Sequence, residues 1–192
     1  MGKTILAIGS YRTGWAVGVE LFGKLEQMAR CAKSRLKPCA YLHWTAGRYD
    51  QVFEDYHLSV KGDGNVYAPG EDLAIYREHT WRRNTGAVGI ALCCALGAGP
   101  DRDGLPAGDY PPTAAQIETA AKVIAVLAKS WDILITPEYF MTHAEAADLD
   151  GYGPATTFER WDLWKLKDFD GAIRSGGDVL RGKANWYRES GI

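Results

Sequence analysis

A histidine at the end of an apolar run is the first residue of the chain whose chemistry stands out. The run is Tyr41–Gly47 (YLHWTAG), and it closes on small, turn-favouring residues. In an extended strand side chains alternate, so His43 shares a face with Tyr41 while Leu42 and Trp44 share the other. A strand end holds a side chain rigidly, and neutral imidazole is a common zinc ligand. His43 is therefore either a candidate metal ligand or a structural histidine.

The residues that could complete a metal site with His43 lie far from it in the sequence. His143 and Asp162 have side chains that bind metals, but neither forms a local zinc-binding motif with His43, so the three could meet only through the fold. The cysteines form no CxxC pair and no disulfide framework, and two of them are adjacent in an expected buried strand. They are Cys31, Cys39, Cys93 and Cys94.

Composition limits the class of protein. A length of 192 residues suits one compact domain, and 46% hydrophobic and 24% charged residues are ordinary for a globular protein. A net charge of -2 gives no basic footprint for nucleic acid. The apolar run at the N-terminus predicts neither a signal peptide nor a membrane span, so we expect synthesis in the cytoplasm.

Helices and strands alternate in the first half of the chain. Apolar residues recur at steps of three and four over Trp15–Arg35, which predicts an amphipathic helix, and Pro38 ends it before a strand over Cys39–Trp44. The segments Tyr56–Lys61 and Val66–Tyr67 flank a Gly-Asp-Gly-Asn turn and predict a hairpin. Such a mixture predicts an α/β protein in which helices cover a sheet.

A further strand is expected over Ala87–Cys94. One of its faces carries large apolar residues, and the other carries only Gly89, Ala91 and Cys93. Small residues on a strand leave room either for a cleft over the sheet or for close packing under a helix. The sequence leaves these two alternatives open.

The second half contains a long loop and a second helix. The segment Gly97–Pro112 is rich in Gly, Pro and Asp, and we expect it to border a cleft. A capping-box pattern over Thr113–Gln116 then starts an amphipathic helix that reaches Ala128. The segment Tyr139–His143 predicts a short strand or turn that delivers His143.

The remaining segments are predicted to be irregular or peripheral. We expect a loop over Asp148–Pro154 and place the tail, Asp168–Ile192, on the surface. Within the tail a weak helical pattern runs from Ala172 to Leu180.

Five sequence pieces in a fixed order resemble a known enzyme family. They are YLHWTAG, YHLSVKGDGNVY, the run H-x-x-x-R-N-T-G-A-V-G-I-A-L from His79 to Leu92, THAEAA and RWD. In this order they resemble the zinc-dependent N-acetylmuramoyl-L-alanine amidases, which include phage endolysins and peptidoglycan-recognition proteins. The resemblance covers roughly Cys39 to Leu163.

The resemblance implies a fold and a ligand set. The expected fold is a central mixed β-sheet flanked by helices, with a zinc groove on one face, in a single domain over residues 1–192 whose family-like core is about 39–163. His43 and His143 match the family's two histidine ligands of Zn²⁺, and Asp162 matches a third position that the family fills with Asp or Cys. A fourth coordination position stays open in a catalytic zinc site.

The resemblance also assigns catalytic roles. Tyr56 matches a tyrosine that many members place beside the zinc, where it could orient water or donate to the oxyanion. Arg160 stands where the family commonly has Lys, and a guanidinium can stabilise an oxyanion but hardly releases a proton. Ala91 stands where some members, especially cytosolic recycling amidases, have a Glu as general base. Its absence leaves Tyr56 as the better candidate for that role and favours the endolysin-like branch.

Other polar residues have two interpretations each. His79 matches a histidine in the family's substrate groove or is a plain loop residue, and Asn84 lies in an Arg-Arg-Asn-Thr run that could meet the substrate or form a solvated turn. His57 is expected to be structural because it faces away from Tyr56. Asp148 and Asp150 are rival metal ligands that lack the family's flanking pattern.

The sequence therefore predicts a peptidoglycan amidase that cleaves the amide between the lactyl group of N-acetylmuramic acid and L-alanine. We expect a monomeric phage or prophage endolysin, made in the cytoplasm without a signal peptide and acting on the cell wall. One alternative is a cytosolic amidase that trims recycled muropeptides. The other is a peptidoglycan-binding module on the same fold without catalysis.

Overall fold

A six-stranded mixed sheet forms the centre of the protein. The computed structural model describes residues 4–6, 14–98, 108–153 and 160–191. The strands are β1 (Thr4–Leu6), β2 (Ala40–Trp44), β3 (Leu58–Val60), β4 (Val66–Ala68), β5 (Val88–Leu92) and β6 (Phe140–Thr142). Their order in the sheet is β1-β4-β3-β5-β2-β6. β5 is parallel to β2 and β3, β6 is parallel to β2, and β4 is antiparallel to β1 and β3. The expected mixed α/β sheet is confirmed.

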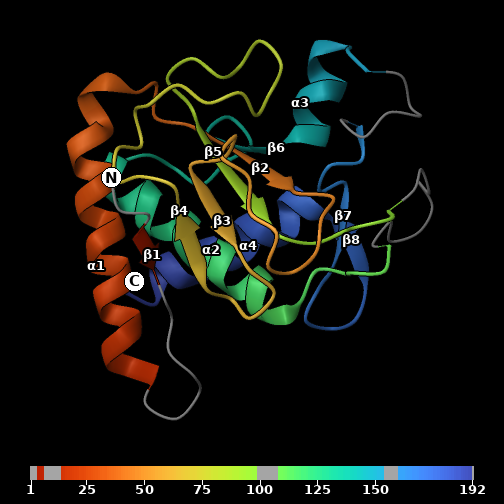
Figure 1. The fold of residues 1–192 in the computed structure, drawn as a ribbon, viewed down its shortest axis with the longest axis horizontal. Helices are drawn as coiled ribbons and strands as arrows, with labels where there is room; N and C mark the ends of the chain where they lie inside the picture. The colour runs from red at the N-terminus through yellow and green to blue at the C-terminus, as the bar shows by residue number, and fades with distance from the viewer. Residues whose placement is uncertain (1–3, 7–13, 99–107, 154–159, 192) are drawn as a thin grey trace.

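Four helices surround this sheet. They are α1 (Gly14–Ala32), α2 (Ala114–Trp131), α3 (His143–Asp150) and α4 (Gly176–Glu189), and a short 3-10 helix, η1 (Lys33–Arg35), follows α1. Figure 1 shows α2 and α4 behind the sheet and α1 along one side of it. α2 packs against both α1 and α4. Within the described residues, no helix combines the length and apolarity needed to cross a membrane.

α2 begins where the capping box predicts it. Thr113 accepts a hydrogen bond from the Gln116 backbone N–H, and the Gln116 side chain accepts one from the Thr113 N–H. Gln116 also donates to the carbonyls of Val60 and Cys93, 2.9 Å away in each case. This fully buried amide therefore joins the helix to the ends of β3 and β5.

The side chains on the two faces of the sheet have different surroundings. Leu42 and Trp44 of β2 point into the apolar core with Ile90 and Leu92 of β5. His43 points to the other face, opposite Ala91 in the register. The alternation expected for β2 is therefore observed, and the sheet separates the main apolar core from the face that carries His43.

The small residues of β5 make room for an imidazole. A Cβ added at Gly89 would lie 2.7 Å from Cγ of His79, so the His79 ring packs directly on the strand backbone. The space over Gly89 is therefore neither an open cleft nor filled by a bulky helix. The loop between β4 and β5 supplies the covering group.

The structure corrects one expectation for the second half. Asp148 and Asp150 belong to α3 and are not in a loop, because the Thr142 capping box starts a helix that continues to Asp150. The part of the Gly97–Pro112 loop over 99–107, and Pro154, lie outside the described residues.

The C-terminal tail is not a surface appendage. It forms an antiparallel hairpin of β7 (Lys165–Lys167) and β8 (Ile173–Ser175), followed by α4. Residues 173–175 of the predicted weak helix are therefore strand. Val179, Leu180 and Ala184 of α4 are buried in the main core. The surface prediction was wrong because the apolar face of α4 is short and interrupted by charges that are used in ion pairs.

Candidate metal centre

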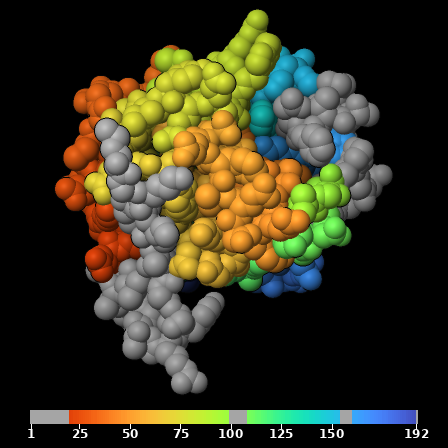
Figure 2. Space-filling view, in the orientation of Figure 1, coloured from red at the N-terminus to blue at the C-terminus, as the bar shows by residue number. Residues whose placement is uncertain are grey.

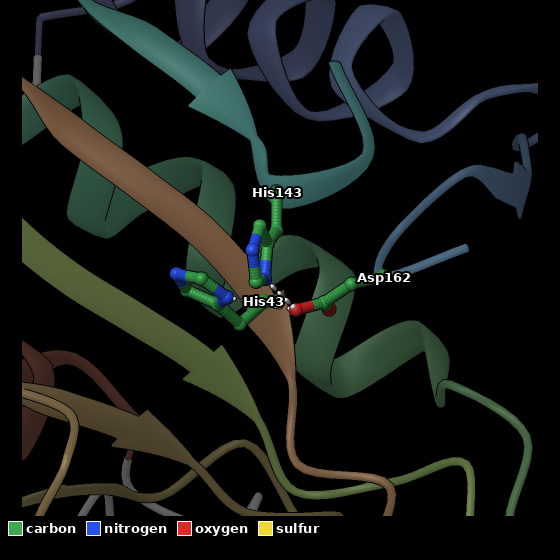
Figure 3. A group of neighbouring side chains, drawn as sticks. All are labelled: His43, His143 and Asp162. Atoms are coloured by element: carbon green, nitrogen blue, oxygen red, sulfur yellow. Dashed lines mark hydrogen bonds and ion pairs between the residues drawn. The ribbon is translucent and has the colours of Figure 1, made fainter. Parts of the chain in front are cut away.

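Three side chains from three separate segments meet on the side of the sheet that carries His43. His43 comes from β2, His143 from the end of β6 where α3 begins, and Asp162 from the chain before β7 (Figure 3). One nitrogen or oxygen of each lies within 4.8 Å of the others. The fold therefore brings together residues that the sequence separates by up to 119 positions.

His43 is held at both ring nitrogens. Its Nδ1 lies 2.7 Å from Oδ2 of Asp162, and its Nε2 lies 3.1 Å from Oγ1 of Thr80. The residue is fully buried. A side chain with both nitrogens engaged in a rigid strand has one orientation, which presents Nδ1 to the cluster.

His143 is placed by the start of α3. It is the first helical residue after the N-cap Thr142, and Glu145 completes a capping box with that threonine. Its Nδ1 lies 3.0 Å from Oδ2 of Asp162. Its Nε2 is buried and has no hydrogen-bond partner among the described residues.

Asp162 connects the cluster to the backbone. Its Oδ1 accepts a hydrogen bond of 2.5 Å from the Trp44 N–H, and its backbone carbonyl accepts one of 3.1 Å from the Ala144 N–H. The next residue, Leu163, has a φ of 57°, a left-handed conformation that costs a branched apolar residue free energy. The chain thus turns sharply directly after the carboxylate.

His43 and Asp162 are in the protonation states that a metal requires. Burial lowers the pKa of His43 against the opposing effect of Asp162, so its imidazole is neutral near pH 7. Burial pushes the pKa of Asp162 up, but the charge and hydrogen bonds of His43 and His143 outweigh it, so that pKa is lowered and the carboxylate is ionised. Neutral imidazole and ionised carboxylate are the zinc-binding forms.

The donor set fits Zn²⁺. Two nitrogens and one oxygen are ordinary zinc ligands, and two ligands about 2.1 Å from one tetrahedral ion lie roughly 3.4 Å apart. The cluster spans no more than 4.8 Å, so small side-chain movements would suffice. Nδ1 of both histidines already faces Oδ2 of Asp162, at 2.7 Å from His43 and 3.0 Å from His143. His43, His143 and Asp162 could therefore hold the ion.

Tyr56 lies beside the cluster. Its ring centroid is 5.1 Å from that of His43, in the segment that precedes β3. Burial and the negative charge of Asp162 raise the pKa of its phenol well above the usual value. The hydroxyl therefore stays protonated at neutral pH, which suits a hydrogen-bond donor and disfavours a general base.

Arg160 is engaged away from the cluster. Its guanidinium hydrogen-bonds to the Asp148 carboxylate and to the Gly153 carbonyl. Asp150 forms a bidentate ion pair with Arg83, in which each carboxylate oxygen lies 2.6 Å from a guanidinium nitrogen. The two rival carboxylates thus bind arginines and stand outside the metal cluster. A catalytic role of Arg160 stays a prediction, and it requires the guanidinium to leave Asp148.

His79 and Asn84 hold the loop beside His43. The Asn84 Oδ1 accepts hydrogen bonds from the backbone N–H groups of His79, at 3.0 Å, and Thr80, at 2.6 Å. His79 is only 7% exposed, and its Nδ1 lies 2.9 Å from Oγ1 of Thr80. Substrate contact by either residue stays a prediction, but both side chains already support the site.

His57 is structural, as the sequence indicates. Its Nε2 donates to the Ile75 carbonyl at 2.8 Å and its Nδ1 accepts from the Gly89 N–H at 2.9 Å. Burial lowers its pKa to about 4. Both ring nitrogens have partners, so neither is available to a metal.

Sequence reasoning missed Thr80. Its hydroxyl touches both His43 and His79, although 37 residues separate it from His43. A threonine in a loop carries no periodic or motif signal. The only available signal was its position next to His79, which the resemblance had already singled out.

The segments around the site meet on one face of the molecule. The segment between β2 and β3, which carries Tyr56, occupies the centre of the view in Figure 2 (orange). The segment between β4 and β5, which carries His79, Thr80 and Asn84, lies beside it (yellow).

One comparison with known proteins identifies a family. A profile described as N-acetylmuramoyl-L-alanine amidase matches residues 27–156. The match includes His43 and His143, and it ends before Asp162, whose place in the cluster comes from the structure. Searches of curated proteins and of solved structures found no match.

Proposed function

Because the chain belongs to the N-acetylmuramoyl-L-alanine amidase family, we propose that it is a zinc-dependent hydrolase of peptidoglycan. It cleaves the amide between the lactyl group of N-acetylmuramic acid and L-alanine. The observation that carries this proposal is the convergence of His43, His143 and Asp162 within 4.8 Å. A binding module without catalysis would not need such a cluster.

The cluster supplies a binding site for Zn²⁺. When bound there, zinc would polarise the scissile carbonyl and lower the pKa of a water molecule to about 7. Neutral His43 and ionised Asp162 would hold it without a net loss of protons, because near pH 7 the imidazole is already neutral and the carboxylate already ionised.

Tyr56 donates a hydrogen bond to the oxyanion that develops on the attacked carbonyl. Its raised pKa keeps the proton on the phenol oxygen, and its ring lies 5.1 Å from the His43 ring. A preorganised donor of this kind contributes about 3 to 4 kcal/mol to transition-state stabilisation. Arg160 can add positive charge to the same oxyanion once its ion pair with Asp148 breaks.

The endolysin type is the form of this function that we favour over muropeptide recycling. Ala91 lies opposite His43 in the register of the sheet. Its methyl side chain offers no carboxylate that could act as a general base at this position. Hydrolysis would then depend on the attacking water molecule, on Tyr56 and on Arg160. It would act on the intact wall.

The test combines metal content with the site of cleavage. Purified protein should contain close to one zinc ion, and digestion of intact sacculi should release stem peptides with a free L-alanine amino group, identified by mass spectrometry. A chelator should stop the digestion and added zinc should restore it. Retention of wall fragments without release of peptides would instead establish a binding module, and faster turnover of soluble muropeptides than of sacculi would establish a recycling amidase.

A further inference from the structure

The Thr80 hydroxyl lies between two imidazoles. Its Oγ1 is 3.1 Å from Nε2 of His43 and 2.9 Å from Nδ1 of His79, and the residue is 1% exposed. The opposite nitrogen of His43, Nδ1, faces Asp162 at 2.7 Å. Thr80 therefore contacts the ligand histidine on the side away from the metal cluster.

We propose that Thr80 is a positioning residue that holds His43 in the orientation and tautomer that bind metal through Nδ1. This inference rests on the proposed zinc amidase function. When Nδ1 gives its lone pair to a metal, the proton of the neutral ring sits on Nε2 and needs an acceptor in this buried place. The Thr80 oxygen is that acceptor.

A hydroxyl suits this position because it can change its role. Without a metal, Nδ1 of His43 can donate its proton to Asp162, and Nε2 then needs a donor. The Thr80 O–H can supply that donor, since a hydroxyl carries one proton and two lone pairs and can rotate. A backbone carbonyl could serve only one of the two tautomers.

The surrounding residues fix the hydroxyl in place. Asn84 accepts hydrogen bonds from the backbone N–H groups of His79 and Thr80, which closes the turn that carries both. The His79 ring rests on Gly89, where an added Cβ would lie only 2.7 Å away. Because Asn84 and Gly89 both restrict the movement of this turn, the Thr80 oxygen can hold His43 in one position. Partners that orient a metal-binding histidine typically change metal affinity 10- to 100-fold when they are removed.

The test measures zinc affinity directly, by competition with a chromophoric chelator at neutral pH. Thr80→Val keeps the shape of the side chain and removes the hydroxyl, so zinc should bind about 10- to 100-fold more weakly. Thr80→Ser keeps the hydroxyl and should bind zinc about as tightly as the wild type. Thr136→Val is the matched control, because its buried hydroxyl has no hydrogen-bond partner among the described residues, and its zinc affinity should not change.

Two failures can be told apart. Wild-type affinity in Thr80→Val would overturn the positioning role and leave the proposed function standing, whereas a wild-type protein that binds no zinc would overturn both. If Thr80→Val does not fold by circular dichroism, ¹⁵N NMR of histidine-labelled wild-type protein decides the question. The positioning role requires that zinc binds His43 at Nδ1 while Nε2 keeps its proton, and zinc bound at Nε2 would contradict it.

Discussion

At the scale of single residues, the Asp162 carboxylate organises the site because its two oxygens have separate partners. Oδ2 faces Nδ1 of both histidines, and Oδ1 accepts the Trp44 N–H. The second contact ties the carboxylate to the backbone of β2. The ligand role and the anchoring role can therefore be separated by a change that keeps the size of the side chain.

Asp162→Asn should remove metal binding while the fold persists. The amide can still accept the Trp44 N–H, but it lacks the negative charge that attracts zinc, so zinc affinity should fall by at least about 100-fold and hydrolysis should be lost. His43→Ala should likewise abolish hydrolysis. Zinc content and release of L-alanyl peptides are the measurements. Asp150→Asn is the control, since Asp150 pairs with Arg83, and stoichiometric zinc in Asp162→Asn would contradict the assignment.

His57 should make the stability of the protein depend on pH. Burial lowers its pKa to about 4, whereas an unfolded histidine has a pKa of about 6.5. Between these values the unfolded chain binds more protons than the native protein, so the free energy of unfolding falls as pH falls. The contribution is complete above about pH 6.5, and about 3 kcal/mol of it is lost by about pH 4.

Denaturant unfolding of the metal-free protein should detect this loss. The wild type should lose roughly 2 kcal/mol through His57 between about pH 7 and about pH 5. His57→Gln should lose correspondingly less over the same interval, although it starts from a lower stability. Equal pH dependence in the two proteins would show that His57 is not buried in its neutral form.

At the scale of elements, α4 supports the two turns that carry His143 and Asp162. The Arg181 guanidinium binds both oxygens of Glu145, each at 2.8 Å, and the Phe140 carbonyl at 3.0 Å. Glu145 is also the capping-box residue of α3. At its first residue, Gly176, α4 approaches the carbonyl of Leu163 so closely that an added Cβ would lie 2.1 Å from it. α4 therefore fixes the ends of both ligand-bearing segments.

Two glycine substitutions in α4 should have opposite effects. Gly176→Ala forces a methyl group against the Leu163 backbone, so it should destabilise the protein by about 1 to 3 kcal/mol and weaken zinc binding by displacing Asp162. Gly182→Ala lies in the same helix with no atom within 4 Å of its added Cβ, and it should stabilise the protein by about 0.5 to 1 kcal/mol. Thermal unfolding and chelator competition measure both effects. Equal stability of the two variants would be evidence against the close approach.

At the scale of the whole molecule, one apolar core extends from α1 through the sheet to α4. It contains Leu25 of α1, Ile90 of β5 and Leu180 of α4. α4 also pairs with α2 at its surface, where Glu118 binds Lys183 and Tyr187, each at 2.5 Å. The C-terminal segment is therefore part of the folding unit, although the family match ends at residue 156.

Removal of residues 164–192 should abolish cooperative folding. It would expose the face of α2 that α4 covers and would lose the burial of Leu166, Val179 and Leu180, each worth about 1.5 to 3 kcal/mol. The sum is comparable to the total stability of a typical domain, about 5 to 15 kcal/mol. Thermal unfolding followed by circular dichroism tests this, and a truncated protein with a sharp transition at the wild-type temperature would refute it.

The sequence by itself determined the local elements and the identity of the chemical groups. Three- and four-residue spacing and capping residues predict α1 and α2, and the glycine-rich turn predicts the β3–β4 hairpin, because these signals depend on neighbours within one or two turns of chain. The resemblance of short motifs to a family selected His43, His143 and Asp162, which the structure brings together. The family itself is confirmed by the match over residues 27–156.

Only the tertiary structure decided which side chains meet. The partners of Arg160, Asn84 and Thr80 lie on other segments, and no periodic pattern encodes a hydrogen bond between distant loops. The tail was misplaced for the same reason, since α4 is recognisable as a core helix only when α2 lies against it. Periodicity specifies which face of an element is apolar. The order of strands in the sheet and the packing of helices on it specify what that face, and the polar face opposite, will touch.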